Sequence, residues 1–453
     1  MLRLYDTATG EVRPLAQREP GTVSIYLCGP TVYGPPHLGH GRATLVYDIL
    51  RRYLEWSGNT VRLVSNVTDI DDKIINRAND EHRDWHEIAT KCESVWFRAM
   101  DSIGVARPTD IPHATDWVEA MVALISELVD SGRAYVTEDG VYLDVTTVPD
   151  YGLLAQQSLD DMLAGGGDRE VVGAEVKRHP ADFALWKLAK PGEPSWPSPW
   201  GPGRPGWHTE CVVMSLGLLG EGFDLHTGGL DLKFPHHENE RAQAVALGKR
   251  FANHWMHHAF ITDASGEKMS KSLGNYDGLL DLIEQVDPRS YRMVLLQAHY
   301  RSPVYVGKDR LEEAARSLRR LDGLARRSAT WPPAEPDPST LEAFTAHMDD
   351  DLDTPGAMAV VFDAVTRANA AADAGDLTTA AALAAAVLSA ARAVGLDVRG
   401  DDEVPDIVVE QVRALDAARA EKDYTTADTI RAALQSEGWV VETTASGTTV
   451  RRA

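Results

Sequence analysis

Two short segments that lie far apart in the chain carry residues suited to reactions at phosphorus. The first is His37-Leu38-Gly39-His40, which follows two prolines and opens a helical pattern. A helix N-terminus binds phosphate through unpaired N–H groups, glycine lets a base or phosphate approach the backbone, and imidazoles can bond oxygens whose charge grows during the reaction. A plain helix start with two solvated histidines is the alternative, and these four residues alone leave it open.

The second segment is Lys268-Met269-Ser270-Lys271-Ser272, followed by leucine, glycine and asparagine. Two lysines three residues apart, on a loop bordered by serine and glycine, can neutralise a polyphosphate as charge develops. An exposed basic loop is the simpler alternative for such a pair. The two segments together predict phosphate chemistry more specifically than either does alone.

Four further residues have the donor atoms of a zinc site: Cys28, Cys211, His236 and Glu240. Two thiolates, an imidazole and a carboxylate suit Zn²⁺, and the spacing of four between the last two puts them on one face of a helix. Spacing alone nevertheless favours a pair of buried apolar cysteines, and His237 leaves the choice of histidine open. We interpret Cys92, within a helical pattern, as structural.

The segment that carries Cys28 and the first two histidines has the pattern of a βαβ unit. A strand is predicted over 22–28, then a turn rich in proline and glycine, a helix whose apolar face ends at Gly58, and a second strand over 61–67. Ligands bind at the turn after the first strand in such units. The following residues, 68–73 (TDIDDK), are predicted to form a capping box and a solvated loop.

Downstream of this unit the patterns change several times. Residues 133–206 are predicted to be an insertion, because they combine one strand (GVYLDV), a run of glycines and a stretch rich in proline and tryptophan that fits neither a helix nor a central strand. A sheet pattern returns at FDLHTGG, and a helix is predicted from about 236 to 248. Two alanine-rich helices, at about 356–374 and 377–395, precede a polar linker and a small unit of two helices and a hairpin.

The composition is that of a globular protein, with 453 residues, 43% hydrophobic and 25% charged. The formal net charge of −23 means that a nucleic-acid partner would be bound through a local patch, for which the arginines of 316–320 and 326–327 are candidates. The 3 cysteines are too few for a disulfide framework, and neither a signal peptide nor a run of about 18 apolar residues is visible. We therefore expect a cytoplasmic enzyme with no membrane partner.

At the level of whole segments, the sequence resembles the cysteinyl-tRNA synthetases. HLGH after a CGP turn, KMSKS, NVTDIDDKI, GRPGWH and FPHHENE carry the resemblance, which extends from about residue 2 to KDYTTADTIRAAL. It implies an α/β fold: a Rossmann-like catalytic domain with a connective insertion, then an α-helical bundle and a small α+β anticodon-binding domain. The implied segments are the first half of the catalytic domain (1–132), the insertion (133–206), the second half (207–255), a stem-contact segment with the KMSKS loop (256–310), the bundle (311–398) and the anticodon-binding domain (399–453).

The resemblance also implies a reaction, the ATP-dependent ligation of L-cysteine to its cognate tRNA(Cys) through cysteinyl-adenylate, by a chain expected to be a monomer. One Zn²⁺ per chain would bind the substrate thiolate, which serine lacks. Its implied ligands, which reverse the preference for apolar cysteines, are Cys28, Cys211, His236 and Glu240. The residues implied in catalysis are His37, His40, Lys268 and Lys271. ATP, with Mg²⁺, would be bound by His37, Gly39, His40 and Lys271. L-Cysteine would be bound by Gly29, Thr31, Thr68, Trp207 and Asp231.

Some positions depart from the family pattern: His113, Val212, Val213, His258, Ala259, Tyr424, Thr443 and Val450. Two other functions are compatible with parts of the sequence. The cysteine ligase of mycothiol biosynthesis has a similar catalytic domain, but Glu240 and the C-terminal unit argue against it. A catalytically inactive tRNA-binding paralogue is disfavoured by the intact HLGH and KMSKS segments.

Overall fold

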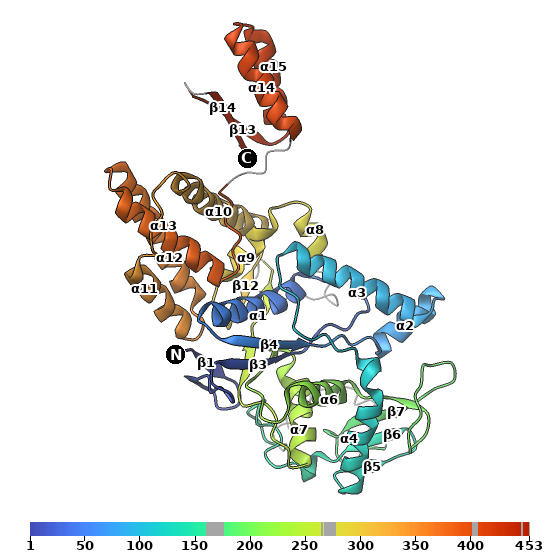
Figure 1. The fold of residues 1–453 in the computed structure, drawn as a ribbon. Coiled ribbons are helices and arrows are strands. Elements are labelled where there is room, and N and C mark those ends of the chain that lie inside the picture. The colour runs from blue at the N-terminus through green and yellow to red at the C-terminus, as the bar shows by residue number, and fades with distance from the viewer. Residues whose placement is uncertain (160–175, 264–265, 267–277, 401–405, 445–446, 453) are drawn as a thin grey trace.

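A parallel four-stranded sheet forms the centre of the catalytic region in the computed structural model, which describes residues 1–159, 176–263, 266, 278–400, 406–444 and 447–452 (Figure 1). The strands run in the order β10-β9-β3-β4, and every neighbouring pair is parallel. Their bounds are β3 (Thr22–Leu27), β4 (Thr60–Ser65), β9 (Leu225–Gly229) and β10 (Trp255–His258). A parallel sheet covered by helices is the Rossmann-like arrangement that the sequence predicts.

The predicted βαβ unit is confirmed, with strands that end one or two residues earlier than predicted. β3 and β4 pair from Thr22 opposite Thr60 onward, and α1 (Leu38–Trp56) connects them. β4 ends before Asn66, because this residue uses its side chain to bind the end of β3: its Oδ1 accepts the Gly29 N–H at 2.9 Å. Only glycine fits at this crossing, since a Cβ on Gly29 would lie 1.6 Å from the Asn66 carbonyl oxygen.

α1 packs on the sheet through the apolar face that its sequence predicts. Leu45, Ile49 and Tyr53 are buried, and they belong to the main core, which joins the sheet to α9 (Pro288–Leu296) and to the helical bundle. Gly58 follows the helix with a φ of +89°, a conformation that favours glycine and ends the helix where predicted.

The insertion forms an antiparallel sheet of its own, in the order β5-β6-β7-β8. Its strands are β5 (Ala134–Val136), β6 (Gly140–Leu143), β7 (Phe183–Leu188) and β8 (Gly203–Pro205). The buried Trp186 lies in its core, which continues into α4 (Val118–Asp130) and α6 (Trp207–Leu219). The stretch rich in proline and tryptophan forms turns and the short edge strand β8, as predicted. The glycine run lies outside the described residues.

The TDIDDK segment connects the insertion to the rest of the chain through side-chain contacts. Asp71 caps α2 (Asp72–Glu81) by accepting a backbone N–H, so the predicted cap is confirmed. The loop is more than a solvated surface, however, because the carboxylate of Asp72 accepts from Lys187 at 2.8 Å and also from Arg204. These two cations lie on β7 and β8, so one carboxylate connects the end of the catalytic sheet with the inserted sheet.

The remaining elements are assigned in chain order. The first group is β1 (Arg3–Asp6), β2 (Glu11–Pro14), α3 (Trp85–Ser102), α7 (Glu238–Ala246), β11 (Ile261–Thr262), α8 (Leu279–Ile283) and β12 (Val304–Tyr305). The helical bundle comprises α10 (Lys308–Ser328), α11 (Pro338–Asp349), α12 (Thr354–Asp373) and α13 (Leu377–Ala393), of which the last two are the predicted alanine-rich helices. The C-terminal unit has its own core and comprises α14 (Asp406–Ala420), α15 (Tyr424–Ser436), β13 (Trp439–Thr444) and β14 (Gly447–Arg452).

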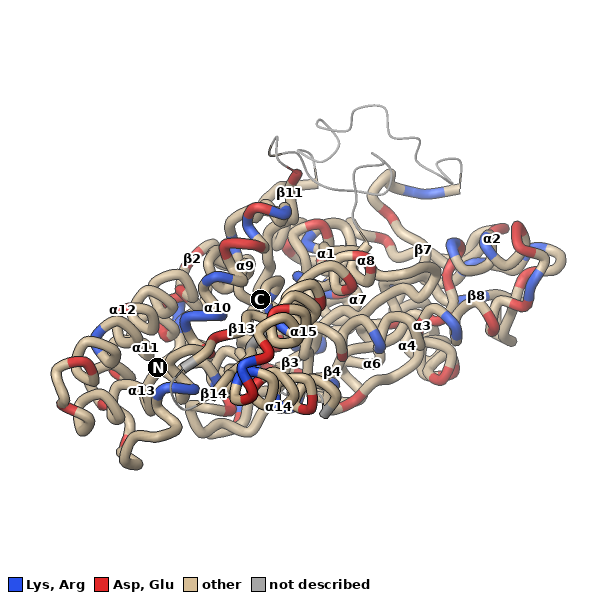
Figure 2. Tube along the Cα trace, turned by 90° about the horizontal axis from the view of Figure 1, so that it is seen from above, with Lys and Arg blue, Asp and Glu red and all other residues tan. Residues whose placement is uncertain are grey.

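Charged residues of both signs are interspersed along the described chain (Figure 2). The arginines of α10 were a candidate surface for a nucleic acid, but two of them make contacts within the bundle. Arg327 pairs with Asp373, and Arg320 donates to Thr366 while its guanidinium lies 4.9 Å from the ring centre of Phe362. Among the described residues, none of the helices is both long and apolar enough to cross a membrane.

Candidate active site and metal centre

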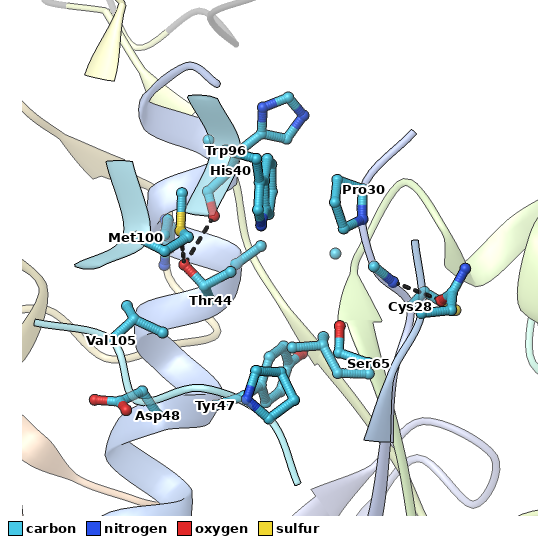
Figure 3. A pocket seen from close by; sticks show the side chains of 18 of the residues that line it. Cys28, Pro30, His40, Thr44, Tyr47, Asp48, Ser65, Trp96, Met100 and Val105 are labelled. Carbon is cyan, nitrogen blue, oxygen red and sulfur yellow. Dashed lines mark hydrogen bonds between the residues drawn. The ribbon is translucent and has the colours of Figure 1, made fainter. Parts of the chain in front are cut away.

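A cavity of about 340 Å³ lies at the carboxyl ends of the parallel strands (Figure 3). Its walls come from the turn after β3, the start of α1, the ends of β9 and β10, and α3. The lining includes four of the predicted cysteine-binding residues, Gly29, Thr31, Trp207 and Asp231. It also includes the three described residues predicted to bind ATP, His37, Gly39 and His40. Parallel α/β sheets bind their ligands at this edge.

The HLGH segment begins α1, as predicted. The backbone N–H of His37, the residue before the helix, donates to Nδ1 of His40 at 3.3 Å. The two imidazoles are stacked with ring centres 3.7 Å apart, and the His40 ring meets Trp96 of α3 edge-on. The hydroxyl of Tyr291 donates to the Leu38 carbonyl at 2.6 Å, so α9 holds the turn. The N-terminus of α1 and both imidazoles therefore lie together at the cavity.

The KMSKS segment, with Lys268 and Lys271, lies outside the described residues. The chain that follows it returns to the HLGH turn: Gly278 pairs with His37, and the Leu279 N–H donates to the Pro36 carbonyl at 3.1 Å. Residues 278 and 279, the first described ones after that segment, therefore lie beside the HLGH turn.

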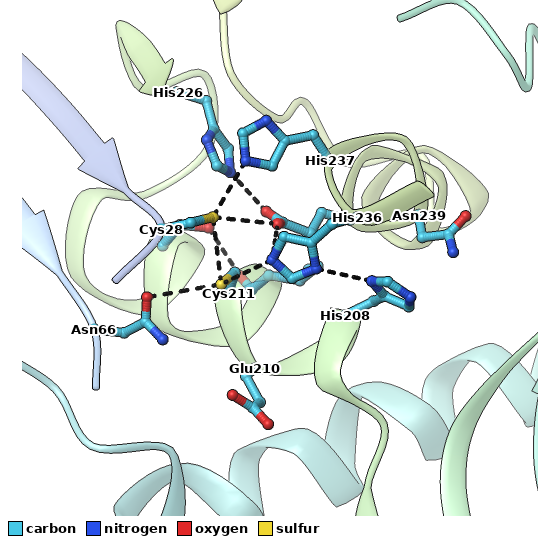
Figure 4. A network of polar contacts seen from close by, with 12 residues as sticks. Cys28, Asn66, His208, Glu210, Cys211, His226, His236, His237 and Asn239 are labelled. Atoms are coloured by element: carbon cyan, nitrogen blue, oxygen red, sulfur yellow. Dashed lines mark hydrogen bonds and ion pairs between the residues drawn. The ribbon is translucent and has the colours of Figure 1, made fainter. Parts of the chain in front are cut away.

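The four predicted metal ligands come together where Cys28 borders the cavity (Figure 4). Their candidate donor atoms all lie within 4.8 Å of one another. Cys28 Sγ is 3.6 Å from Cys211 Sγ and 3.4 Å from Glu240 Oε1, and His236 Nε2 is 2.9 Å from that oxygen. Two thiols, an imidazole and a carboxylate fit Zn²⁺, and their convergence shows that the apolar-cysteine interpretation is wrong.

One local detail differs from the prediction. His236 does not lie in an α-helix with Glu240 but in a short π-helical turn, Lys233–His237, that directly precedes α7. The two side chains still meet, because the chain continues from that turn into α7 without a gap. Cys92 is buried in α3, away from the cluster, which agrees with a structural role.

A second possible set of ligands shares two of these residues: Cys28, His226, His237 and Glu240. His226 Nε2 is 2.6 Å from Glu240 Oε2, and His237 Nε2 is 3.3 Å from Cys28 Sγ. The first set is the one beside the cavity, because Trp207, which lines the cavity, stacks on the His236 ring with centres 3.9 Å apart. His226 instead lies within β9 and stacks on Trp255 of β10.

The electrostatics of the cluster favour the charged form, which a cation binds, at two of the four donors, Glu240 and Cys211. Burial opposes the charge of Glu240, but His226 and His236 hold the pKa of this carboxyl well below its usual range. Burial also raises the pKa of Cys211, yet the hydrogen bonds from Cys28 and His236 outweigh it and lower this pKa to about 6. The pKa of the Cys28 thiol is raised well above its usual value by burial and by the neighbouring Cys211.

Thr68, the fifth predicted cysteine-binding residue, is not among the residues that line the cavity. It is buried outside the cavity lining, and its hydroxyl donates to Glu210 Oε2 at 2.7 Å. Burial raises the pKa of the Glu210 carboxyl well above its usual value. Thr68 therefore supports the chain beside Cys211 rather than lining the cavity.

Sequence reasoning pointed to His237 but missed other buried histidines around the ligands. His208 Nδ1 lies 2.8 Å from His236 Nδ1, and His237 Nδ1 lies 2.8 Å from His257 Nε2. The adjacent histidine pairs in FPHHENE and WMHHAF were a visible signal for this cluster. No signal connected His226 with Glu240, because one lies on β9 and the other on α7.

The comparisons with known proteins agree with this geometry. The model of the tRNA synthetases class I (C) catalytic domain matches residues 14–316, and that of the DALR domain matches residues 343–398. The cysteine--tRNA ligases of Streptomyces avermitilis and Halorhodospira halophila are each 43% identical to the chain. The alignment covers 98% of both chains for the first relative and 100% of both for the second.

The chain belongs to the cysteine--tRNA ligase family. Solved structures support the fold of this family member. The methionyl-tRNA synthetase of Mycobacterium tuberculosis with methionyl-adenylate matches with a TM-score of 0.61 at 15% identity, over 82% of this chain and 89% of that one. The LeuRS of a ternary complex from Agrobacterium radiobacter matches with a TM-score of 0.64 at 11% identity, over 87% and 88%.

Proposed function

We propose that the chain joins L-cysteine to tRNA(Cys) in two steps, with cysteinyl-adenylate as the intermediate and with a zinc ion that recognises the substrate thiolate. The observation that carries this proposal is the convergence of the candidate zinc donors at Cys28, which lines the same cavity as the HLGH turn. Cys28 and His37 both border that cavity, so one bound substrate can meet both groups.

The first step is the attack of the cysteine carboxylate on the α-phosphorus of ATP, which breaks the bond to pyrophosphate. The N-terminus of α1 offers backbone N–H groups and the positive end of the helix dipole to the α-phosphate. His37 and His40 stand beside it and can donate to oxygens that gain charge in the transition state. Lys268 and Lys271 are proposed to bind the departing pyrophosphate together with Mg²⁺.

Recognition of the amino acid is proposed to rest on the sulfur atom. When bound by Cys28, Cys211, His236 and Glu240, Zn²⁺ supplies a soft Lewis acid that binds a thiolate in preference to a protonated hydroxyl. Trp207 is 38% exposed at the cavity, so its ring can cover the bound substrate. Asp231 and the backbone at Gly29 and Thr31 are the remaining candidate contacts.

In the second step, a ribose hydroxyl of the terminal adenosine of the tRNA attacks the carbonyl of the adenylate, and AMP leaves. We propose that the bundle and the C-terminal unit bind the rest of the tRNA. The core that α14, α15 and their hairpin share supports a separate module for this contact. The presence of this unit and of Glu240 in the donor set favours tRNA over a small-molecule acceptor.

The test is cysteine-dependent exchange of pyrophosphate into ATP, measured with a panel of amino acids, followed by aminoacylation of tRNA(Cys). We expect exchange with cysteine and rejection of serine by on the order of 10⁴ or more, the scale for a site built around one polar group. Elemental analysis should give one zinc per chain. Full activity of a metal-free preparation, or ready activation of serine, would contradict the proposal.

A further inference from the structure

Arg42 is a buried cation on α1, two residues after the second histidine of the HLGH segment, and it is only 2% exposed. Its guanidinium donates to three backbone carbonyls that belong to other parts of the chain. Nη1 donates to Phe260 at 2.6 Å, and Nη2 donates to Tyr300 at 2.9 Å and to Ser302 at 2.6 Å.

These carbonyls belong to two segments that lie side by side. The Ala259 N–H donates to the Tyr300 carbonyl at 2.9 Å, and the Val304 N–H donates to the Phe260 carbonyl at 3.1 Å. The same two segments continue into the parallel pair β11 and β12. Arg42 therefore fills the junction between α1 and this small sheet.

The first of the two segments is also a wall of the cavity. Residues 258–261 line it, as do His37, Gly39 and Arg42 itself. The HLGH turn and this wall lie on different elements, so the distance between them depends on the contacts that connect α1 to the wall. Two α1 side chains bond to the wall directly: Arg42 donates to the Phe260 carbonyl, and the Tyr47 hydroxyl lies 3.2 Å from His258 Nδ1. Arg42 is the one of the two that also bonds to the second segment, at Tyr300 and Ser302.

Burying the charged Arg42 side chain costs solvation free energy that an apolar residue would not lose. Burial lowers the pKa of Arg42 to about 10, although the nearby hydroxyls of Tyr291 and Tyr47 favour its charge, and it stays protonated at neutral pH. Within the described residues, no carboxylate forms an ion pair with it, and its Nε has no hydrogen-bond partner. Its planar fork does offer donors in several fixed directions, which lysine lacks.

We propose that Arg42 is a positioning residue for ATP: it sets the distance between the HLGH turn and the wall formed by residues 258–261. The proposal rests on the proposed function, because that function places the nucleotide in this cavity. Arg42 acts through the wall and not on the reacting atoms. Its loss therefore affects the productive placement of ATP, while the candidate zinc ligands, which lie after β3, in α6, in the turn before α7 and in α7, keep their arrangement.

The test compares Arg42→Lys with Arg292→Lys, measured by ATP-dependent kinetics of the cysteine-dependent exchange. Arg292 is a matched control, because it is an equally buried arginine that donates to the carbonyls of Gly104 and Val394. Arg292 does not line the cavity and reaches it only through its ion-pair partner Asp48, away from the wall formed by residues 258–261. We expect Arg42→Lys to lower kcat/KM for ATP by about 10- to 100-fold, the scale for a small misplacement of reacting groups. The KM for cysteine and the zinc content should not change, and Arg292→Lys should leave the ATP kinetics intact.

Each outcome bears on the assignment. Wild-type ATP kinetics in folded Arg42→Lys, or an equal loss in both arginine variants, would overturn the positioning role. Arg42→Gln serves as a second variant that keeps two donors, and unfolding of both Arg42 variants would show that the arginine is structural instead. Absence of exchange in the wild-type protein would contradict the proposed function itself. The comparison of the arginine variants tests this inference separately, because it is made only when the wild-type protein is active.

Discussion

The two overlapping ligand sets lead to a prediction about which histidine binds zinc. Both sets use Cys28 and Glu240, so they differ in whether Cys211 and His236 or His226 and His237 complete the site. His236 is 2.9 Å from the Glu240 carboxylate and packs on Trp207 at the cavity, whereas His237 bonds to His257 on its far side. We therefore expect His236→Ala to remove a ligand and His237→Ala to remove only a supporting contact.

The size of each effect can be worked out from the number of donors. Zinc binding by four protein donors is worth about 10–16 kcal/mol, or about 2.5–4 kcal/mol for each donor. At about 1.4 kcal/mol for each factor of ten, loss of the His236 donor weakens zinc binding by about 10²- to 10³-fold. A supporting contact to a ligand is worth about 10- to 100-fold, so His237→Ala should be the milder change.

The assay is competition for zinc with a chromophoric chelator at one fixed pH, because protons compete for the same donors. Elemental analysis of each purified variant gives the zinc content per chain. Cys211→Ser should lose zinc, and Cys92→Ser is its matched control, since Cys92 is also buried but lies on α3. Weaker binding in His237→Ala than in His236→Ala would refute the reasoning and select the second ligand set.

Three further predictions concern catalysis, modularity and acid stability. Lys271→Ala should raise the barrier to adenylate formation by about 2–4 kcal/mol, the scale for one electrostatic stabiliser, with cysteine affinity retained; unchanged single-turnover activation would contradict this. Deletion of residues 399–453 should preserve pyrophosphate exchange and abolish aminoacylation, since the unit has its own core; loss of both activities in a folded truncation would argue against a separate module. Burial raises the pKa of Asp287, but the Arg289 guanidinium at 2.6 Å outweighs burial and lowers this pKa below its usual value. The pair therefore stabilises the fold above a pH of about 3.9, and this contribution is lost as the pH falls. In urea unfolding, the free energy of unfolding of Asp287→Asn should depend less on pH over that acid range than that of the wild type.

The parts of the fold that the sequence predicts well are those set by local patterns. The apolar face of α1 and the stop at Gly58 follow from spacing and from one glycine, and both are confirmed. The start of α1 at the HLGH turn follows from the prolines before it. Strand ends were less predictable, because β4 stops where the Asn66 side chain binds Gly29, a contact between residues far apart in the chain.

The metal ligands show where local patterns carry too little information. Spacing could relate His236 to Glu240 but not to Cys28 or Cys211, and it favoured the wrong interpretation of the two cysteines. Only the resemblance to a family supplied the full set, and the structure brings those residues together. Thr68, which came from the same resemblance, is used inside the protein by Glu210. His226 and His257 were missed because contacts between residues on β9, β10 and α7 produce no periodic pattern in the sequence.

The distance along the chain between the two cysteines has a consequence for the order of events during synthesis. Cys28 and Cys211 are 183 residues apart, and the whole insertion is translated between them. At about 5–20 residues per second, the first thiol is synthesised about 10 to 40 s before the second. β9, the neighbour of β3 in the sheet, follows β3 after a similar delay. A ribosome-bound chain can therefore complete the sheet and the candidate zinc site only after β10 has emerged, just past the middle of the 453 residues, and the insertion must fold first or be held aside.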